Sequence, residues 1–395
     1  MSRSSELQFA LERHATELER RFGPGGPWRS FFSPGRVNLF GAHLDYNGGP
    51  VMPTAIDRGT FISLREGRPS RLRLASTLDD TNFDIGLDEL PDSPQGGWYD
   101  YPIGVVRTMR FALGADRIGG IDVMFGGDLP IGAGLSSSAS ICVGFAFALN
   151  EFFDLGLDPI ARIGAALDAE RGYVGVQCGI MDPYAVGLAK PNHVLWLECK
   201  SGVYEHVPLD FERVAIGVAD TGVRRELAQG EFNKRVAECA AAYEGLKAFD
   251  PQASCLAQIS PAVLEEHAGS LDEALRRRAL HVVHENARAY EARAALERGD
   301  LAALGDNMLR THASLRELYE VSCHELDVLV EAAGSSSAIF GGRLTGAGFG
   351  GCVVILADPN RKELAREDLT RAFVDALGRE PVIEFFGGDA GPREY

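Results

Sequence analysis

Residues 126–140 read GGDLPIGAGLSSSAS and join a strand-like run, GIDVMF (120–125), to a helical pattern that begins at Ser138. Glycines let backbone N–H groups point into a concavity, and a helix N-terminus adds a partial positive charge, so this geometry binds phosphate. A serine-capped helix after a tight turn is the ordinary alternative. Three consecutive serines after GAGL favour phosphate binding.

Two familiar phosphate motifs do not fit this stretch. No Gly-Lys-Ser/Thr follows, as a Walker A loop requires, and the third glycine of a dinucleotide fingerprint is missing. Because the loop has no lysine, Mg²⁺ held by a serine hydroxyl would have to supply the positive charge.

Two other glycine-rich stretches lie far away in the chain. GRVNLFGAHLDYNGG (35–49) places Arg36, His43 and Asp45 among four glycines, and RLTGAGFGGC (343–352) precedes an apolar strand. A β-turn with a bulge is the simpler interpretation of the second stretch.

Two carboxylates lie between these stretches. Asp182 stands in CGIMDP (178–183), where we expect the chain to leave regular structure, and an Asp before Pro is commonly a turn residue. Glu170 lies near the end of a predicted helix, where surface exposure is the ordinary alternative.

The composition limits the possible partners and location. The 395 residues suffice for two domains, and no apolar run reaches the ~20 residues that span a bilayer. The amphipathic start lacks an apolar signal core. Seven scattered cysteines without a CxxC pair indicate free thiols in a reducing cytoplasm. A net charge of −17 argues against binding nucleic acid or anionic membranes. We expect a cytoplasmic protein, and a monomer.

Hydrophobic periodicity predicts a mixed first half and a mainly helical second half, divided by a composition shift near residues 200–222. The predicted strands are 60–64, 71–75, 120–125, 193–198, 203–207 and 351–357. The predicted helices are 138–153, 159–173, 224–249, 261–297, 301–333 and 361–377.

The three glycine-rich stretches together resemble the signature motifs of the GHMP small-molecule kinases, in the order and spacing of the galactokinase branch. GVQCGIMDPY, VRRELAQGEFNKRVAEC, RRRALHVVHEN and HASLRELYEVSCHELDVLVEAA resemble further segments of that branch. The resemblance runs from about Arg29 to the C-terminus. It implies a two-lobed α+β fold with the active site in the cleft. Residues 1–205 would form an N-terminal lobe with a mixed sheet, and residues 206–395 a C-terminal lobe with an antiparallel sheet and long helices.

The resemblance also implies the chemistry, which is transfer of the γ-phosphate of ATP to the anomeric hydroxyl of a sugar. Asp182 would take the proton from that hydroxyl. Arg36 would keep Asp182 ionised and balance the charge on the transferring phosphoryl group. Ser138 and Glu170 would hold Mg²⁺.

The glycine-rich loops take their expected roles from the same resemblance. The backbone of the ATP-binding loop comprises Gly132, Ala133, Gly134, Leu135, Ser136 and Ser137, followed by Ser138. The third-motif loop, which comprises Gly346, Ala347, Gly348 and Gly350, would pack against the first motif between the lobes. His281 and His284 have helical spacing for a metal pair but no evident third ligand, and the resemblance gives His281 a structural role.

The expected sugar pocket contains Arg36, Ala42, His43, Asp45, Gly179, Asp182 and Phe232. Asp45 would accept hydrogen bonds from O3 and O4 of a galactose-like ring, a role that needs an acceptor without a donor. His43, if protonated, could pair with a carboxylate at C6.

Two residues depart from the galactokinase pattern. Ala42 stands where galactokinases have a glutamate that holds O6, and Phe232 stands where they have a tyrosine whose hydroxyl reaches the sugar. A lost hydrogen bond to a buried sugar hydroxyl costs on the order of 1–3 kcal/mol. Loss of the glutamate also removes repulsion against a C6 carboxylate. The sequences GAH (41–43) and GAGF (346–349) resemble those of plant galacturonate kinases.

Three sugars therefore stay open from the sequence: D-galactose, D-galacturonate and L-arabinose, which has no C6. From another class of function, a non-catalytic sugar and ATP sensor is an alternative. The intact Asp182, Arg36 and GLSSSAS loop favour the kinase.

Overall fold

The computed structural model describes residues 3–130, 134–176, 178–224 and 228–395. Its N-terminal part is built on a mixed sheet in the order β13-β1-β3-β6-β4-β5, in which β4 and β6 are parallel and the other neighbours antiparallel. The strands are β1 (Trp28–Asn38), β3 (Pro53–Glu66), β4 (Arg71–Ser76), β5 (Asp79–Gly86), β6 (Ile121–Gly127) and β13 (Arg393–Glu394).

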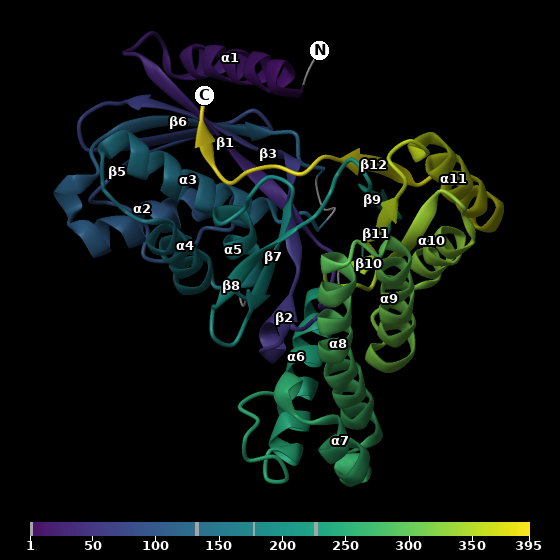
Figure 1. The fold of residues 1–395 in the computed structure, drawn as a ribbon. Helices are drawn as coiled ribbons and strands as arrows, with labels where there is room; N and C mark the ends of the chain where they lie inside the picture. Colours follow the sequence, from purple (N-terminus) through teal and green to yellow (C-terminus); the bar gives the residue numbers. More distant parts are fainter. Residues whose placement is uncertain (1–2, 131–133, 177, 225–227) are drawn as a thin grey trace.

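Helices cover both faces of this sheet (Figure 1). Adjacent residues of a strand point to opposite faces, and Phe31 and Phe32 of β1 accordingly belong to different apolar clusters. Phe32 packs with Leu7 and Leu11 of the N-terminal helix. Phe31 belongs to the cluster formed with the helices of the other face. The helices are α1 (Arg3–Phe22) on the first face and α2 (Asp100–Leu113), α3 (Ser137–Phe153) and α4 (Pro159–Asp168) on the second.

A second sheet forms the core of the C-terminal part. Its order is β10-β11-β9-β12, and all neighbours are antiparallel. Its strands are β9 (Ala215–Asp220), β10 (Ile339–Thr345), β11 (Cys352–Ala357) and β12 (Val382–Phe386). The helices α9 (Leu301–Ser314), α10 (His324–Ser335) and α11 (Lys362–Leu377) pack beside it, while α6 (Ala228–Leu246), α7 (Pro261–His267) and α8 (Glu273–Glu297) extend away from it (Figure 1).

A small third sheet lies between these two regions. It has the order β2-β7-β8, from β2 (Pro50–Val51), β7 (His193–Glu198) and β8 (Tyr204–Pro208). Because β2 directly follows the glycine-rich stretch 35–49, this sheet fixes one end of that stretch. The C-terminal tail crosses back to the first sheet, where Glu394 pairs with Phe31.

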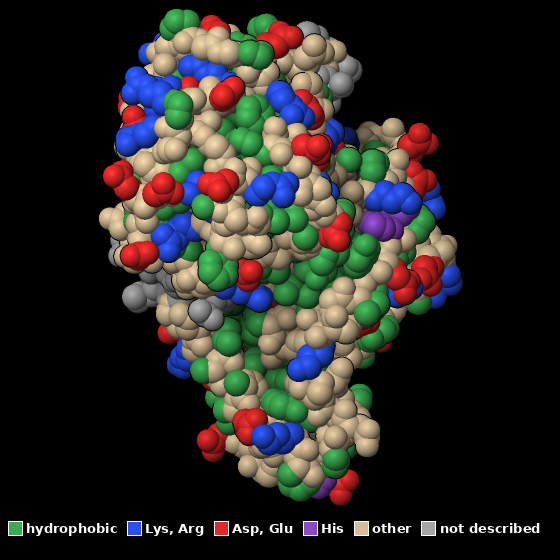
Figure 2. Space-filling view, turned by 90° about the vertical axis from the view of Figure 1, so that its left-hand side faces the viewer, with side chains coloured by type: hydrophobic (Ala, Val, Ile, Leu, Met, Phe, Trp, Pro, Cys, Tyr) green, Lys and Arg blue, Asp and Glu red, His purple; other side chains and the backbone are tan. Residues whose placement is uncertain are grey.

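The predicted α+β class, with a mixed sheet followed by an antiparallel sheet and helices, is confirmed. The division at residue 205 stays a prediction. No helix in the described ranges is long and apolar enough to cross a membrane. On the face shown in Figure 2, acidic and basic side chains are interspersed.

Three predicted helices were wrong in their extent. The predicted helix 261–297 is divided into α7 and α8 by a short 3-10 turn, Ala268–Ser270. The predicted helix 301–333 is divided by a π-helical turn, Leu315–Tyr319, which ends at Glu320 with φ +56°. The predicted helix 159–173 becomes a second π turn, Ala169–Val174, after Asp168.

The expectation that Asp182 lies outside regular structure was also wrong. Asp182 stands in the first turn of α5 (Met181–Gly187). Pro183 follows it, and proline is tolerated in a first turn because its missing N–H would have no partner there.

Candidate active site

Asp182 and Arg36 form an ion pair between the N-terminal end of α5 and strand β1. Arg36 Nε and Nη2 lie 2.7 and 2.6 Å from Asp182 Oδ1. Arg36 is 6% exposed, whereas the Asp182 side chain keeps 28% of its surface open. A buried, permanent cation therefore holds a carboxylate that a ligand can still reach. The structure brings together the two residues that the sequence assigned to catalysis.

The phosphate-binding loop is attached directly to this pair. Ser136 Oγ donates a hydrogen bond to Asp182 Oδ2 at 2.5 Å, and Arg36 Nη1 donates to the carbonyl of Gly134 at 2.7 Å. Ser136 has φ +60°, a conformation uncommon for residues other than glycine. Sequence reasoning assigned Ser136 to phosphate only and missed its contact with Asp182. Gly132 and Ala133 lie outside the described residues.

Two cavities meet at the ion pair. One, of about 420 Å³, is lined by the phosphate loop from Gly134 to Ser138, and the other, of about 270 Å³, by Ala42, His43 and Asp45. The residues that line both cavities are Arg36, Asp182, Gly346 and Ala347. The ion pair therefore stands where a group in one cavity would react with a group in the other.

Glu170 and Ser138 form a set of hard oxygen donors beside the phosphate loop. Glu170 lies on the π turn Ala169–Val174, is 2% exposed, and its Oε2 has no hydrogen-bond partner. Burial raises the pKa of Glu170 to about 7, against a hydrogen bond from Ser138 that lowers it. An orphaned buried carboxylate oxygen beside a hydroxyl fits Mg²⁺, whose remaining ligands are usually phosphate oxygens and water. Within the described ranges, His, Cys, Asp and Glu form no group of three that could hold a metal by themselves.

Asp45 lies in the smaller cavity, in the 3-10 turn Asp45–Asn47. Burial, reinforced by the nearby charge of Asp182, raises the pKa of Asp45 to about 6. The backbone N–H of Tyr46 donates to Oδ1 at 2.8 Å. A Cβ at position 179 would stand 2.0 Å from Oδ2, so the close approach of Asp45 requires Gly179. Asp45 and Gly179, both predicted to line the sugar pocket, therefore lie side by side.

The structure does not favour a protonated His43, which the sequence left open. Burial lowers the pKa of His43 to about 3, so the imidazole is neutral and cannot pair as a cation with a C6 carboxylate. Its Nδ1 lies 2.8 Å from the Tyr46 hydroxyl, while Nε2 is buried and has no partner. The sequence left the protonation of His43 open, because sequence alone does not report burial, and the structure favours the neutral form.

The cation in this cavity, besides Arg36, is Arg343, which sequence reasoning missed. Arg343 is 2% exposed and lines the cavity together with Ala42. Its guanidinium donates to the carbonyls of Leu39, Asn38 and Leu344 at 2.9, 2.8 and 2.6 Å. Among the described residues, no carboxylate forms an ion pair with it. Burial lowers the pKa of Arg343 to about 10. One sequence feature could have identified Arg343, because the segment RLTG (343–346) places an arginine in a buried strand.

Ala42 and Phe232 complete the wall of the cavity. The Ala42 N–H donates to the buried Glu285 Oε1 at 3.0 Å, and its carbonyl lies 3.4 Å from His281 Nε2. His281 Nδ1 contacts Ser314 Oγ at 2.8 Å, so both ring nitrogens have protein partners. Phe232, on α6, packs edge-on against the ring of Tyr46.

The third glycine-rich loop closes the site from the C-terminal part. A Cβ at Gly134 would lie 3.8 Å from the Cα of Gly346, so the phosphate loop and the third loop face each other. At Gly348 (φ +84°), a Cβ would stand 2.4 Å from the carbonyl of Val321. Gly350 has φ +137°, which also favours glycine. Arg343, at the start of this segment, donates to the carbonyls of Asn38 and Leu39 in the glycine-rich stretch 35–49. The two stretches therefore pack against each other, as expected.

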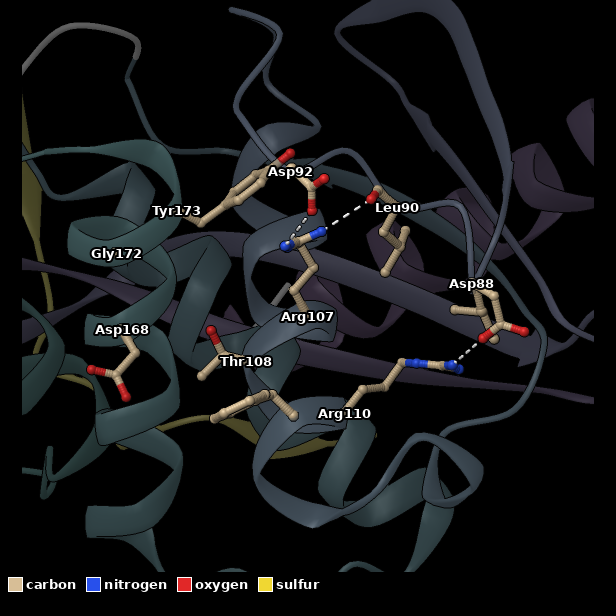
Figure 3. A pocket seen from close by; sticks show the side chains of 11 residues that line it. Asp88, Leu90, Asp92, Arg107, Thr108, Arg110, Asp168, Gly172 and Tyr173 are labelled. Atoms are coloured by element: carbon tan, nitrogen blue, oxygen red, sulfur yellow. Dashed lines mark hydrogen bonds and ion pairs between the residues drawn. The ribbon is translucent and has the colours of Figure 1, made fainter.

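Another hollow, of about 530 Å³, lies beyond the π turn that carries Glu170 (Figure 3). Arg107 bonds to Asp92 and to the carbonyl of Leu90 at 3.2 and 3.0 Å, and Arg110 bonds to Asp88 at 2.6 Å. Because these guanidinium groups already have carboxylate partners, this hollow offers a ligand little unpaired positive charge.

Comparisons with known proteins first establish the class to which this protein belongs. Residues 100–190 match the GHMP kinases N terminal domain, and residues 292–375 match the GHMP kinases C terminal family. Residues 16–66 match the galactokinase galactose-binding signature. The crystal structure of Methanococcus jannaschii mevalonate kinase shares the fold, with a TM-score of 0.69 at 19% identity over 93% of this chain and 100% of that one.

Full-length relatives define the branch. A galactokinase of Roseiflexus sp. (strain RS-1) is 42% identical over 355 residues, 89% of each chain. One of Clostridium tetani is 35% identical over 94% of each chain. The crystal structure of Lactococcus lactis galactokinase complexed with galactose superposes with a TM-score of 0.93 at 30% identity, covering 98% of this chain and 100% of that one. The chain therefore belongs to the galactokinase family of GHMP kinases.

Proposed function

We propose that this protein is an ATP-dependent sugar 1-kinase that phosphorylates the anomeric hydroxyl of D-galactose or a close relative. The observation that carries the proposal is the place of Asp182, which Arg36 and Ser136 hold where the phosphate-loop cavity meets the cavity of Asp45. The family relationship supplies the substrate class.

Each part of the site has a role in this reaction. Asp182 accepts the proton of the attacking hydroxyl, and Arg36 balances the negative charge of the transferring phosphoryl group. The loop amides and the N-terminus of α3 hold the phosphates. Asp45 accepts hydrogen bonds from two ring hydroxyls. Mg²⁺, held by Ser138 and Glu170, supplies positive charge to the phosphates when it is bound.

A substrate that lacks the reacting oxygen tests the proposal. We expect ADP release from ATP with D-galactose, and none above background with 1-deoxygalactose, which has every other hydroxyl. Release with both sugars would show hydrolysis or transfer to another hydroxyl and would contradict the proposal.

A second substrate, D-galacturonate, is favoured by one observation. The cavity places the buried guanidinium of Arg343, without a carboxylate partner among the described residues, beside the small Ala42. The buried Glu285 lies near enough to favour the charge of Arg343 but forms no ion pair with it, and a C6 carboxylate in direct contact would compensate this buried charge further. L-arabinose has no C6 group and would therefore bring no carboxylate to the Arg343 guanidinium.

Ala42→Glu tests which end of the sugar Ala42 faces. The new carboxylate can accept a hydrogen bond from a C6 hydroxyl and repels a C6 carboxylate, so we expect the galactose-to-galacturonate ratio of kcat/KM to rise roughly tenfold or more. Steady-state kinetics with both sugars measure it. Ala42→Gln is the matched control, with equal bulk but no charge, and should change the ratio less. A fall in the ratio would show that Ala42 does not face C6.

The acidity of Asp45 predicts a pH dependence of sugar binding. Its pKa is raised from 3.8 to about 6, and protonation places an O–H donor where the ionised carboxylate offers two hydroxyls only acceptors. Galactose affinity should be full above about pH 6 and fall by up to tenfold per pH unit below it. Calorimetric titration without nucleotide measures this, with Asp45→Asn as a weak-binding control that should not follow the profile. An affinity that stays constant down to pH 5 would contradict the assignment.

We also propose that the protein acts as a cytoplasmic monomer with lobes formed by residues 1–205 and 206–395. Seven free cysteines support the reducing location. The change from the mixed sheet to the antiparallel sheet, between β8 and β9, supports the division. The intact contacts of Asp182 support a catalyst rather than a sensor.

A further inference from the structure

A chain of hydrogen bonds leads away from the sugar cavity into the protein. His43 Nδ1 lies 2.8 Å from the Tyr46 hydroxyl, which lies 2.8 Å from the Tyr319 hydroxyl. Cys239 Sγ lies 3.1 Å from the same Tyr319 hydroxyl. These hydrogen bonds therefore join the glycine-rich stretch 35–49 to the π turn Leu315–Tyr319 and to α6, which also carries Phe232.

The members of this chain keep their protons. Tyr319 is 0% exposed, and burial raises the pKa of both Tyr46 and Tyr319 well above the ordinary value. Burial also raises the pKa of the Cys239 thiol to about 11 and lowers that of His43 to about 3. All groups are thus neutral, and each contact contains one proton.

Two arrangements of these protons place every hydroxyl proton inside the chain, so that no buried hydroxyl is left without an acceptor. In the first, the Cys239 thiol donates to Tyr319, Tyr319 to Tyr46, and Tyr46 to His43 Nδ1, which leaves the His43 proton on Nε2. In the second, every bond runs the other way, His43 Nδ1 donates, and Nε2 is a bare acceptor.

The first arrangement is chemically better. It gives a phenol proton to an imidazole nitrogen, which is a strong acceptor, and the weakly accepting sulfur receives no phenol proton. It also gives the thiol proton a partner. The Asn47 side chain contacts Cys239 and lowers the pKa of its thiol, as a donor to sulfur does, and the same amide donates to the His43 carbonyl at 2.8 Å. The sulfur, a weak acceptor, therefore already has one donor, which favours the thiol proton as the donor to Tyr319.

We propose that Tyr46 and Tyr319 are positioning residues that hold His43 as the Nε2–H tautomer, so that His43 presents a hydrogen-bond donor to a sugar oxygen. Its Nε2 is a buried nitrogen without a protein partner on a side chain that lines the cavity. The rings of Tyr319 and Tyr46, at 4.8 and 5.9 Å from the imidazole, hold its orientation. The assignment of the ligand as a sugar rests on the proposed function. The cavity would then offer donors from His43 and Arg343 and favour a sugar oxygen that accepts.

The tautomer can be measured without activity. In the sugar-free, ¹⁵N-histidine-labelled protein, with His43 signals assigned through His43→Gln, long-range ¹H–¹⁵N correlation should show a protonated Nε2 and a bare Nδ1. Tyr319→Phe removes the donor to Tyr46 and should populate both tautomers. Tyr243→Phe is the matched control, because it removes a hydrogen-bonded tyrosine hydroxyl outside the chain, the donor from α6 to the carbonyl of Ala253, and should leave the His43 signals unchanged.

Kinetics and a second pair of variants complete the test. Tyr319→Phe should raise the KM for the sugar roughly threefold to tenfold with the KM for ATP unchanged. If Tyr319→Phe fails to fold, Cys239→Ser, which keeps a donor, should preserve the tautomer, and Cys239→Ala should relax it. An Nδ1–H tautomer in the unmodified protein, or variants that retain both its tautomer and its KM, would overturn the inference. Absence of turnover with any sugar would instead overturn the proposed function, while the tautomer measurement would still decide this inference.

Discussion

Replacing Asp182 with asparagine is expected to reduce kcat by about 10²–10⁴-fold, the usual range for loss of a general base. Asparagine has the same shape, its amide oxygen can accept from Arg36, and its NH2 group can donate to Ser136 Oγ, so the loop and both cavities should persist. What is lost is the ability to take the proton of the anomeric hydroxyl. Single-turnover assays with galactose measure the rate.

Binding measurements separate this effect from misfolding. Galactose and ATP affinities of Asp182→Asn should stay within a few-fold of those of the unmodified protein. A kcat within tenfold of the unmodified value would contradict the role of Asp182, and it would leave Arg36 and the phosphate loop as the main source of catalysis.

Replacing Arg36 with methionine is expected to reduce kcat by about 10²–10³-fold. The change removes the cation beside the transferring phosphoryl group and the hydrogen bond to the Gly134 carbonyl that fixes the phosphate loop. Arg36→Lys should recover only part of the rate, because lysine keeps the charge but cannot contact Asp182 and the loop with the geometry of a guanidinium.

An exposed arginine provides the matched control for this prediction. Arg310, on α9, forms exposed ion pairs with Glu291 and Asp306, and exposed pairs contribute little. Arg310→Met should keep the kcat of the unmodified protein. Equal kcat for Arg36→Met and Arg310→Met would exclude an electrostatic role of Arg36.

The sequence predicted most elements near the phosphate site because local signals were strong there. The glycines and serines of 126–140 mark the end of β6 and the start of α3, and the observed bounds differ from the predicted ones by one or two residues. The long helices were wrong because their apolar pattern continues across the breaks. The break after Tyr319 depends on a π turn, which tertiary contacts such as the bond from Arg235 to the Tyr319 carbonyl stabilise.

The site was predicted where a residue type alone implies its chemistry, as for Asp182 and Arg36. It was missed where the role depends on burial or on contacts distant in sequence. Arg343 bonds to the Leu39 carbonyl, 304 residues away, and burial together with the nearby His281, Arg343 and Arg235 lowers the pKa of His43. Ser136 differs from its neighbouring serines only by its backbone conformation, which points its hydroxyl to Asp182.

The position of the phosphate in the product tests the mechanism. Purified protein, ATP, Mg²⁺ and galactose should give a product whose ³¹P signal correlates most strongly with the proton on C1, and Asp182→Asn should give almost none of it. A phosphate on another carbon, or free inorganic phosphate as the main product, would show that the anomeric hydroxyl does not lie against Asp182.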